Sequence, residues 1–185
     1  MLRLFIAVEL PPDLQRKLSS VKNEMKKVKD AKWVEPQNLH LTLKFLGNCS
    51  EEKVSTIIES VASCVKNAKP FAFKLNGLGC FPSNKRARVF WIGIKEGEED
   101  LIKLQQFVEE ALKPLGFKKE ERAFHAHVTL ARLRRPQDMR LGIASIETEE
   151  FSTPFIQVKS ITLFQSRLTP SGPIYSEIAK IPLKG

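Results

Sequence analysis

The sequence is poor in cysteine and has no long hydrophobic run. Its 185 residues include three cysteines, Cys49, Cys64 and Cys80, and no two of them have Cys-x-x-Cys spacing. An odd number of scattered thiols favours a reduced, cytoplasmic protein over a disulfide-stapled one and argues against a structural zinc site. No apolar stretch approaches the roughly 20 residues that a membrane-spanning helix needs. We therefore expect a cytoplasmic protein that does not enter a membrane.

Negative charge is scarce as well. The chain has 30 Lys and Arg against 21 Asp and Glu, a net charge of +9. This excess favours a polyanionic partner, with RNA or DNA ahead of an acidic membrane surface, although a lysine-rich protein can carry it for solubility alone. With 9 Gly, 11 Pro and 42% hydrophobic residues, the composition is that of an ordinary globular protein.

Hydrophobic spacing predicts alternating strands and helices. Apolar residues three and four positions apart predict amphipathic helices, over residues 12–28, 51–65 and 98–112. Runs rich in Val, Ile, Leu and Phe predict strands, over residues 2–10, 39–46, 71–78, 89–94, 125–133, 151–164 and 174–181. Residues 134–150 read as a less regular connection.

The order strand, helix, strand occurs twice. Each copy begins with an Arg-x-Phe strand, ending at Phe5 and at Phe90, which we take as equivalent positions. His40 follows Phe5 by 35 residues and His127 follows Phe90 by 37. We interpret this as an internal duplication with pseudo-twofold symmetry, covering about residues 1–47 and 87–133 of one bilobal domain that spans residues 1–185. The alternative is coincidence, because such units are common.

Two of the three histidines lie in the same motif. His40 is followed two residues later by Thr42, and His127 by Thr129. Because residues i and i+2 of a strand point to one face, each motif places an imidazole beside a hydroxyl. One imidazole can accept a proton while the other donates one, and hydroxyls can bind phosphate oxygens. This set indicates phosphate-ester chemistry; the alternative is two half-buried strand histidines.

The motifs and their flanking residues resemble a known family. The matching blocks are RLFIA at residues 3–7, NLHLTLKFLG at 38–47 and HVTLAR at 127–132. They are similar to the RNA 2′,3′-cyclic phosphodiesterases, also called 2′-5′ RNA ligases, of the two-histidine phosphoesterase superfamily. The resemblance covers nearly the whole chain. It implies an α+β fold of two pseudo-twofold-related lobes, each an antiparallel-type sheet backed by helices, with both motifs in a central groove.

The resemblance also implies an activity. Members of the family open RNA 2′,3′-cyclic phosphates to 2′-phosphates, and some catalyse reversible 2′-5′ ligation of tRNA halves. By resemblance, His40 donates a proton to the leaving 3′-oxygen and His127 accepts one from water, whereas the symmetry of the motif alone leaves this order open. We expect Thr42 and Thr129 to act with them, without metal or cofactor. The expected partner is RNA with 2′,3′-cyclic phosphate ends, tRNA fragments included, and the expected state is a monomer.

Three further residues are candidates for substrate binding. Arg132 matches the family's arginine after the second motif and could hold phosphate as a planar fork. Regular alternation turns it away from His127, so it reaches the groove only across a bulge. Lys44 has the parity of Thr42 and could face the anion, or be an exposed lysine at the strand end. Phe5 could stack a base or pack in the core.

One departure and two rival functions complete the sequence-based interpretation. The family usually has Pro before the second motif, where this chain has Ala126. His125 is an extra imidazole, which we interpret as a surface residue, with an RNA contact as the alternative. The rival functions are a non-catalytic RNA-binding module and a metal-dependent phosphohydrolase with histidine ligands. The motif strands contain no carboxylate, which weakens the metal hypothesis.

Overall fold

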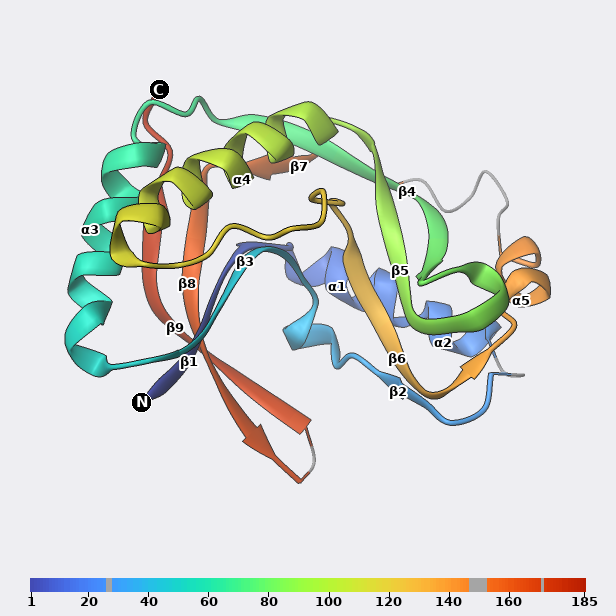
Figure 1. Ribbon diagram of the computed structural model, residues 1–185. Helices are drawn as coiled ribbons and strands as arrows, with labels where there is room; N and C mark the ends of the chain where they lie inside the picture. Colours follow the sequence, from blue (N-terminus) through green and yellow to red (C-terminus); the bar gives the residue numbers. More distant parts are fainter. Residues whose placement is uncertain (26–27, 147–152, 171) are drawn as a thin grey trace.

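The computed structural model describes residues 1–25, 28–146, 153–170 and 172–185 (Figure 1). Its strands are β1 (Leu2–Glu9), β2 (Ala31–Trp33), β3 (His40–Cys49), β4 (Phe71–Phe81), β5 (Ala87–Glu96), β6 (Val128–Gln137), β7 (Ile156–Val158), β8 (Ser160–Thr169) and β9 (Gly172–Pro182). Its α-helices are α1 (Pro12–Ser19), α2 (Val21–Glu24), α3 (Val54–Val65), α4 (Glu98–Leu112) and α5 (Arg140–Ala144). No helix in these described ranges is long and apolar enough to cross a membrane.

The strands pair in the order β7-β4-β5-β6-β3-β1-β8-β9. Strand β2 pairs with β6 on the same edge as β3, opposite β5. Every pairing among the described strands is antiparallel. We call β3, β1, β8 and β9 the β3 half, and β7, β4, β5, β6 and β2 the β6 half. The halves meet where Leu41 of β3 pairs with Val128 of β6. The predicted α+β class with antiparallel sheets is confirmed.

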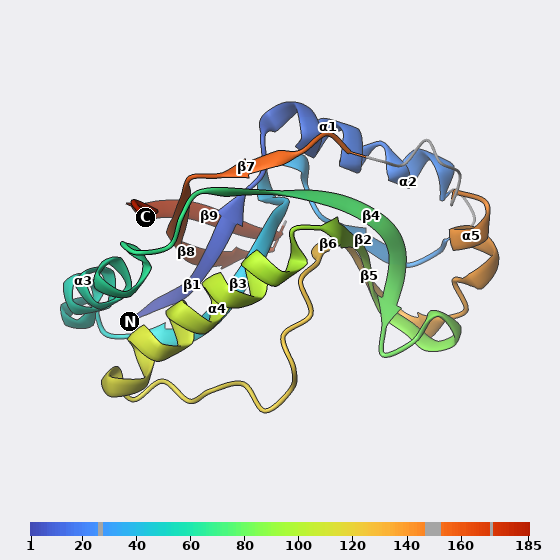
Figure 2. The same ribbon diagram turned by 90° about the horizontal axis from the view of Figure 1, so that it is seen from above.

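Two of the longer helices, α1 and α4, pack against the half of the sheet that does not contain the strand before them. Pro12 occupies the first turn of α1, where its missing N–H costs nothing. Although α1 follows β1 of the β3 half, α1 and α2 lie beside β6 and β2 (Figures 1 and 2). Conversely, α4 follows β5 of the β6 half and packs against β3. Helices α1 and α4 therefore each cover the sheet of the opposite half, whereas α3, which follows β3, packs against β9 of its own half.

The two histidine strands have matching β-bulges. Ile6 pairs with Lys44 and Ala7 with Thr42, so Leu43 has no partner on β1. In the other half Phe90 pairs with Ala131 and Trp91 with Thr129, so Leu130 has no partner on β5. Buried leucines thus form a bulge directly after each His-x-Thr motif.

The same pairings show which residues of β1 and β5 are equivalent. Phe5 pairs with Phe45 and Val89 pairs with Arg132, each on the far side of a bulge. Phe5 therefore corresponds to Val89. The predicted equivalence of Phe5 and Phe90 is wrong by one residue, because the Arg-x-Phe sequences do not share a register.

Several predicted boundaries also change. The helix predicted over residues 12–28 breaks at Ser20 and ends at Glu24, with residues 26–27 outside the described part. The strand predicted over 125–133 begins at Val128 and runs on to Gln137. The strand predicted over 151–164 is two strands interrupted at Lys159, and residues 147–152 lie outside the described part. The helix predicted over 98–112 is confirmed at both ends.

Candidate active site

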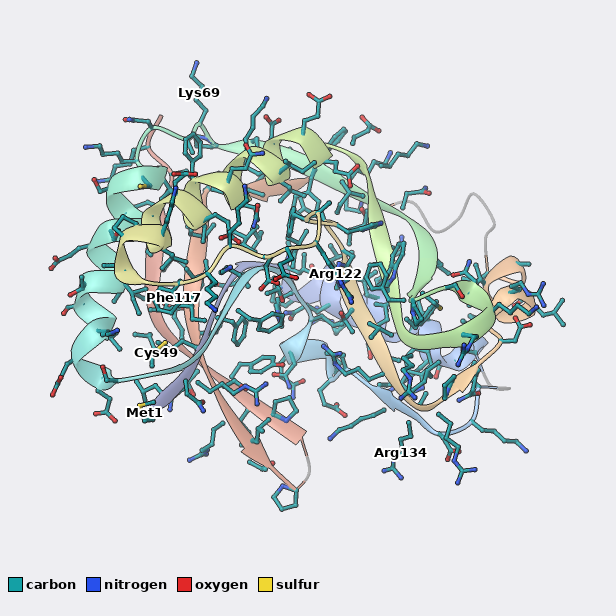
Figure 3. All side chains as sticks on the ribbon, viewed as in Figure 1. Met1, Cys49, Lys69, Phe117, Arg122 and Arg134 are labelled. Carbon is teal, nitrogen blue, oxygen red and sulfur yellow. The ribbon has the colours of Figure 1, made fainter. Side chains whose placement is uncertain are left out.

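The seam between the halves brings the two His-x-Thr motifs together. Because Leu41 pairs with Val128 in antiparallel register, continuing it by one residue sets His40 opposite Thr129 and Thr42 opposite His127. All four side chains are half-buried, and directly opposite residues share a face of the sheet. We call this face the site face. His127 reaches it at the end of the segment that leaves α4 and passes Phe117 and Arg122, which are labelled in Figure 3.

Backbone carbonyls orient both imidazoles in the same way. His40 Nδ1 lies 2.7 Å from the carbonyl oxygen of Asn38, and His127 Nδ1 lies 2.6 Å from that of His125. A carbonyl oxygen only accepts hydrogen bonds, so each Nδ1 carries the proton and donates it. Each neutral ring is therefore left with an unprotonated Nε2 that can exchange protons. His40 Nε2 lies 2.9 Å from the hydroxyl oxygen of Thr42.

Both histidines are weak bases in the free protein. Burial lowers the pKa of His40 to about 4, the hydrogen bond to Asn38 opposes this, and the charges of Arg132 and His127 lower it further. Burial also lowers the pKa of His127, with further lowering by His125 and Arg132. Both rings are thus neutral at pH 7. A bound anion would favour the protonated form of either ring, because opposite charge stabilises an imidazolium.

The bulge at Leu130 turns Arg132 to the site face. Along β6, Thr129 is half-buried, Leu130 and Ala131 are buried, and Arg132 is exposed. Side chains of a regular strand alternate between its two faces, and the two consecutive buried residues interrupt this alternation. Arg132 therefore lies on the same face of β6 as Thr129. Its charge also lowers the pKa of both motif histidines. The sequence predicted that Arg132 reaches the groove only if its strand contains a bulge, and β6 contains one.

The prediction that Lys44 faces the anion is wrong. The bulge at Leu43 turns Lys44 away from Thr42 to the opposite face of β3, where its side chain is 3% exposed. Its ammonium nitrogen lies 2.9 Å from Oε1 of Glu109 on α4, whose side chain is 5% exposed. Regular alternation from Thr42 could not anticipate this, because a single extra residue exchanges the two faces of a strand.

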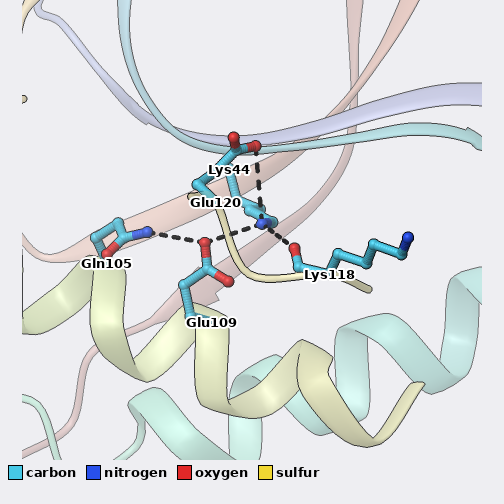
Figure 4. Close-up of polar contacts among 5 residues, drawn as sticks. All are labelled: Lys44, Gln105, Glu109, Lys118 and Glu120. Atoms are coloured by element: carbon cyan, nitrogen blue, oxygen red, sulfur yellow. Dashed lines mark hydrogen bonds and ion pairs between the residues drawn. The ribbon is translucent and has the colours of Figure 1, made fainter. Parts of the chain in front are cut away.

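The buried Lys44 joins three parts of the chain (Figure 4). Besides the ion pair with Glu109, its Nζ donates to the carbonyl oxygen of Lys118 over 2.6 Å and lies 3.9 Å from Oε1 of Glu120. Gln105 donates to Glu109 over 3.0 Å, so the carboxylate has a second partner. The cluster connects β3 and α4 with the segment that leads to His127.

Phe5 does not offer a free ring for stacking. It is 2% exposed, and its ring centroid lies 4.9 Å from those of His40 and Tyr175 and 5.2 Å from that of Phe164. The expected base-stacking role is therefore corrected to that of a support beneath His40. The exposed ring nearby is Phe45, whose centroid lies 6.0 Å from Phe5 and which is 58% exposed.

A second aromatic cluster surrounds His127. The rings of Phe81 and Trp91 lie 5.1 Å and 6.1 Å from that of His127, and the exposed His125 lies 4.9 Å from Trp91. Gly79 makes this possible, because a Cβ there would lie 2.3 Å from the Trp91 ring. The sequence alone did not indicate the place of Trp91 beside His127.

Possible metal ligands do not gather within residues 1–25, 28–146, 153–170 and 172–185. No three His, Cys, Asp or Glu side chains in these ranges come together as ligands of one ion. His125 and His127 are close, with ring centroids 6.1 Å apart. Their surroundings are aromatic rings.

Comparison with known proteins agrees with the fold. The family described as LigT like Phosphoesterase matches the chain twice, over residues 8–91 and 92–175. The second match begins at Ile92, which pairs with Val128 as Val8 pairs with Leu41. The two matches therefore begin at equivalent positions, Val8 of β1 and Ile92 of β5.

Relatives cover nearly the whole chain. An Archaeoglobus fulgidus protein named RNA 2′,3′-cyclic phosphodiesterase is 38% identical over 179 residues, 96% of this chain and 98% of its own. A crystal structure from Thermus thermophilus superposes with a TM-score of 0.81 at 26% identity, covering 99% of this chain and 98% of that chain. Escherichia coli LigT complexed with 3′-AMP has the same fold, with a TM-score of 0.77 at 24% identity over 100% of this chain and 99% of its own.

These matches show that the protein is a phosphoesterase. Within that class, the chain belongs to the LigT-like phosphoesterase family.

Proposed function

We propose that this protein hydrolyses RNA 2′,3′-cyclic phosphate ends to 2′-phosphates. The observation that carries the proposal is the pair of histidines on one face, each with Nδ1 bound to a backbone carbonyl and Nε2 left for proton transfer. The name of the Archaeoglobus fulgidus relative supports RNA 2′,3′-cyclic phosphates as the substrate. The net charge of +9 suits an RNA partner.

Two proton transfers complete the proposed reaction. Nε2 of His127 accepts a proton from water as the water oxygen bonds to phosphorus. The bond from phosphorus to the 3′-oxygen breaks, and protonated Nε2 of His40 gives its proton to that oxygen. The product carries a 2′-phosphate and a free 3′-hydroxyl. Exchange with solvent then removes the proton from His127 and returns one to His40.

Thr42, Thr129 and Arg132 stabilise the phosphate in this proposal. The two hydroxyls and the guanidinium donate hydrogen bonds to the non-bridging oxygens, which gain negative charge as the water adds. The anion also raises the pKa of the acid histidine, whose free value is too low for it to be charged at pH 7. Substrate binding would therefore take up a proton.

The same groups can join two RNA ends. A 5′-hydroxyl of a second RNA end would replace water, losing its proton to His127 while the 3′-oxygen leaves with the proton from His40. The product is a 2′-5′ phosphodiester, and the reverse reaction cleaves it. We include this ligation, with tRNA fragments among its substrates, in the proposal, together with a cytoplasmic, monomeric state.

Product analysis tests the proposal. An RNA oligomer with a 2′,3′-cyclic phosphate is digested in excess chelator, and 2′- and 3′-phosphate products are separated. We expect the 2′-phosphate. A predominantly 3′-phosphate product contradicts the bond assignment, loss of activity in chelator contradicts acid–base catalysis by histidines alone, and tight RNA binding without turnover at several pH values supports the non-catalytic alternative.

A further inference from the structure

Basic side chains extend the site face beyond Arg132. On β2, Lys32 pairs with Arg132 of β6, so the two side chains share that face. Arg134 follows Arg132 by two residues and therefore has the same facing. Its backbone N–H donates to the carbonyl oxygen of Asp30 over 3.2 Å, which continues the β2–β6 pairing by one step. Lys32, Arg132 and Arg134 are all exposed.

Two of these cations border a hollow of about 430 Å³, lined by Asp30, Ala31, Lys32, Arg134 and Pro170. This volume lies within the range of small-ligand sites. Pro170, which directly follows β8, also belongs to the lining. The start of β9 lies close by: a Cβ on Gly172 would lie 3.6 Å from the Lys32 ammonium, and Asn38 donates to the carbonyl oxygen of Pro173 over 2.9 Å.

The charges of the hollow favour an anion. Among the described residues, neither Lys32 nor Arg134 has a carboxylate within 4.0 Å, whereas Lys44, Arg140 and Lys180 each have at least one. The lining contains one carboxylate, Asp30, and two cations, so its net charge is positive. Unpaired cations on a surface next to a phosphate site favour a second phosphate.

We propose that Lys32 and Arg134 form a second anion site that binds the backbone phosphate preceding the cyclic end of the RNA. This inference rests on the proposed function and names the part of the substrate beyond the reacting nucleotide. At about 3.3 Å per strand residue, Arg134 lies about 7 Å beyond Arg132 and about 16 Å beyond Thr129. The separation from Arg132 matches the spacing of neighbouring RNA phosphates, and the long side chains of Lys32 and Arg134 bring the next phosphate within their reach. At the position that the cationic Arg132 occupies in the β6 half, the β3 half has the uncharged Phe45. The RNA therefore leaves the site over β6 and β2.

The test compares a cyclic mononucleotide with an oligonucleotide that ends in the same cyclic nucleotide. In the double variant Lys32→Met/Arg134→Met we expect KM for the oligonucleotide to rise about tenfold and the dependence of log KM on log salt to flatten by about 0.7, the contribution of the one phosphate contact that is lost. The mononucleotide lacks the second phosphate, so its kcat and KM should not change.

A matched control removes two charges elsewhere. Lys69 is labelled on the far side of the molecule from Arg134 (Figure 3), and Lys113 is exposed at the end of α4. The variant Lys69→Met/Lys113→Met has the same net charge as the test variant. Equal effects of both variants on the oligonucleotide would reduce the proposal to general charge attraction and overturn it.

A neutral methylphosphonate in place of single RNA phosphates locates the contact. At the linkage that Lys32 and Arg134 bind, the methylphosphonate should raise KM in the wild type and have no further effect in the double variant, because the two changes remove one interaction. Independent, additive effects at every linkage would overturn the site. If the wild type cleaves neither substrate, the proposed function fails separately, and the same comparison of oligonucleotide affinity still decides the anion site.

Discussion

Phe45 and Arg132 occupy equivalent positions in the two histidine strands, each two residues beyond the leucine that forms the bulge. Both side chains are exposed on the site face. One half therefore presents a hydrocarbon ring where the other presents a guanidinium. The two motif strands are therefore alike in their histidines and threonines but differ in charge two residues beyond the bulge.

The motif histidines should be needed for turnover and not for folding. We expect His40→Ala and His127→Ala each to lower kcat by roughly 10²- to 10⁴-fold, because each removes one proton transfer. The matched control is His125→Ala, which removes an exposed imidazole beside His127 and should be mild. Initial rates on a cyclic nucleotide, with circular dichroism for folding, check this. Equal damage by all three changes would contradict the model of two acting histidines.

Burial is the main cause of the low pKa of both histidines, and the charge of Arg132 should add to it. Because its charge lowers the pKa of His40 and of His127, Arg132→Met should raise both values, as measured by NMR titration. It should also lower kcat/KM by roughly 10²-fold, the typical cost of one donor to an oxygen that gains charge. Arg132→Lys keeps the charge but loses the fork, so the pKa values should stay near wild type while activity falls. A lower pKa in Arg132→Met would contradict this arrangement.

The low pKa of His40 makes stability depend on pH. In the unfolded chain this group titrates near 6.5 and in the folded protein at about 4, so the unfolded state binds the extra proton between these values. The contribution of His40 is complete above pH 6.5, declines as pH falls, and levels off below about pH 4; the change is on the order of 3 kcal/mol. Denaturation of wild type and His40→Gln from pH 7.5 to 4 measures it. A difference in unfolding free energy that is independent of pH would refute the prediction.

The buried ion pair should matter for stability. Lys44→Met leaves the Glu109 carboxylate without its cation in a buried place and should cost about 3–5 kcal/mol. The double variant Lys44→Met/Glu109→Leu removes both charges and should recover part of this loss. Lys118→Met is the control, because Lys44 binds only the backbone oxygen of Lys118, and it should stay within about 0.5 kcal/mol of wild type. Urea denaturation compares the four proteins; a neutral Lys44→Met would show that the pair contributes nothing.

Sequence alone predicts most of the strands, the longest helix and the pairing of the two motifs, because these depend on local periodicity. It misses the three-residue β2 and joins β7 with β8. The bulges at Leu43 and Leu130 depend on how each strand matches its neighbours, which local periodicity does not contain. This is why alternation placed Lys44 on the wrong face and left Arg132 conditional. The roles of Phe5 and Trp91 depend on rings from distant strands, so single-strand parity could not assign them.

The crossing of α1 and α4 between the halves means that neither half encloses its own core. A chain cut between β4 and β5 would yield two fragments: the first would carry β1 and β3 without β8, β9 and α4, and the second would carry β5 and β6 without β4, β2 and α1. Such fragments would be expected to regain structure by complementing one another in trans rather than singly. A chain with a single strand-helix-strand unit would, by the same packing, close its core as a domain-swapped homodimer, with two histidines meeting across the twofold axis.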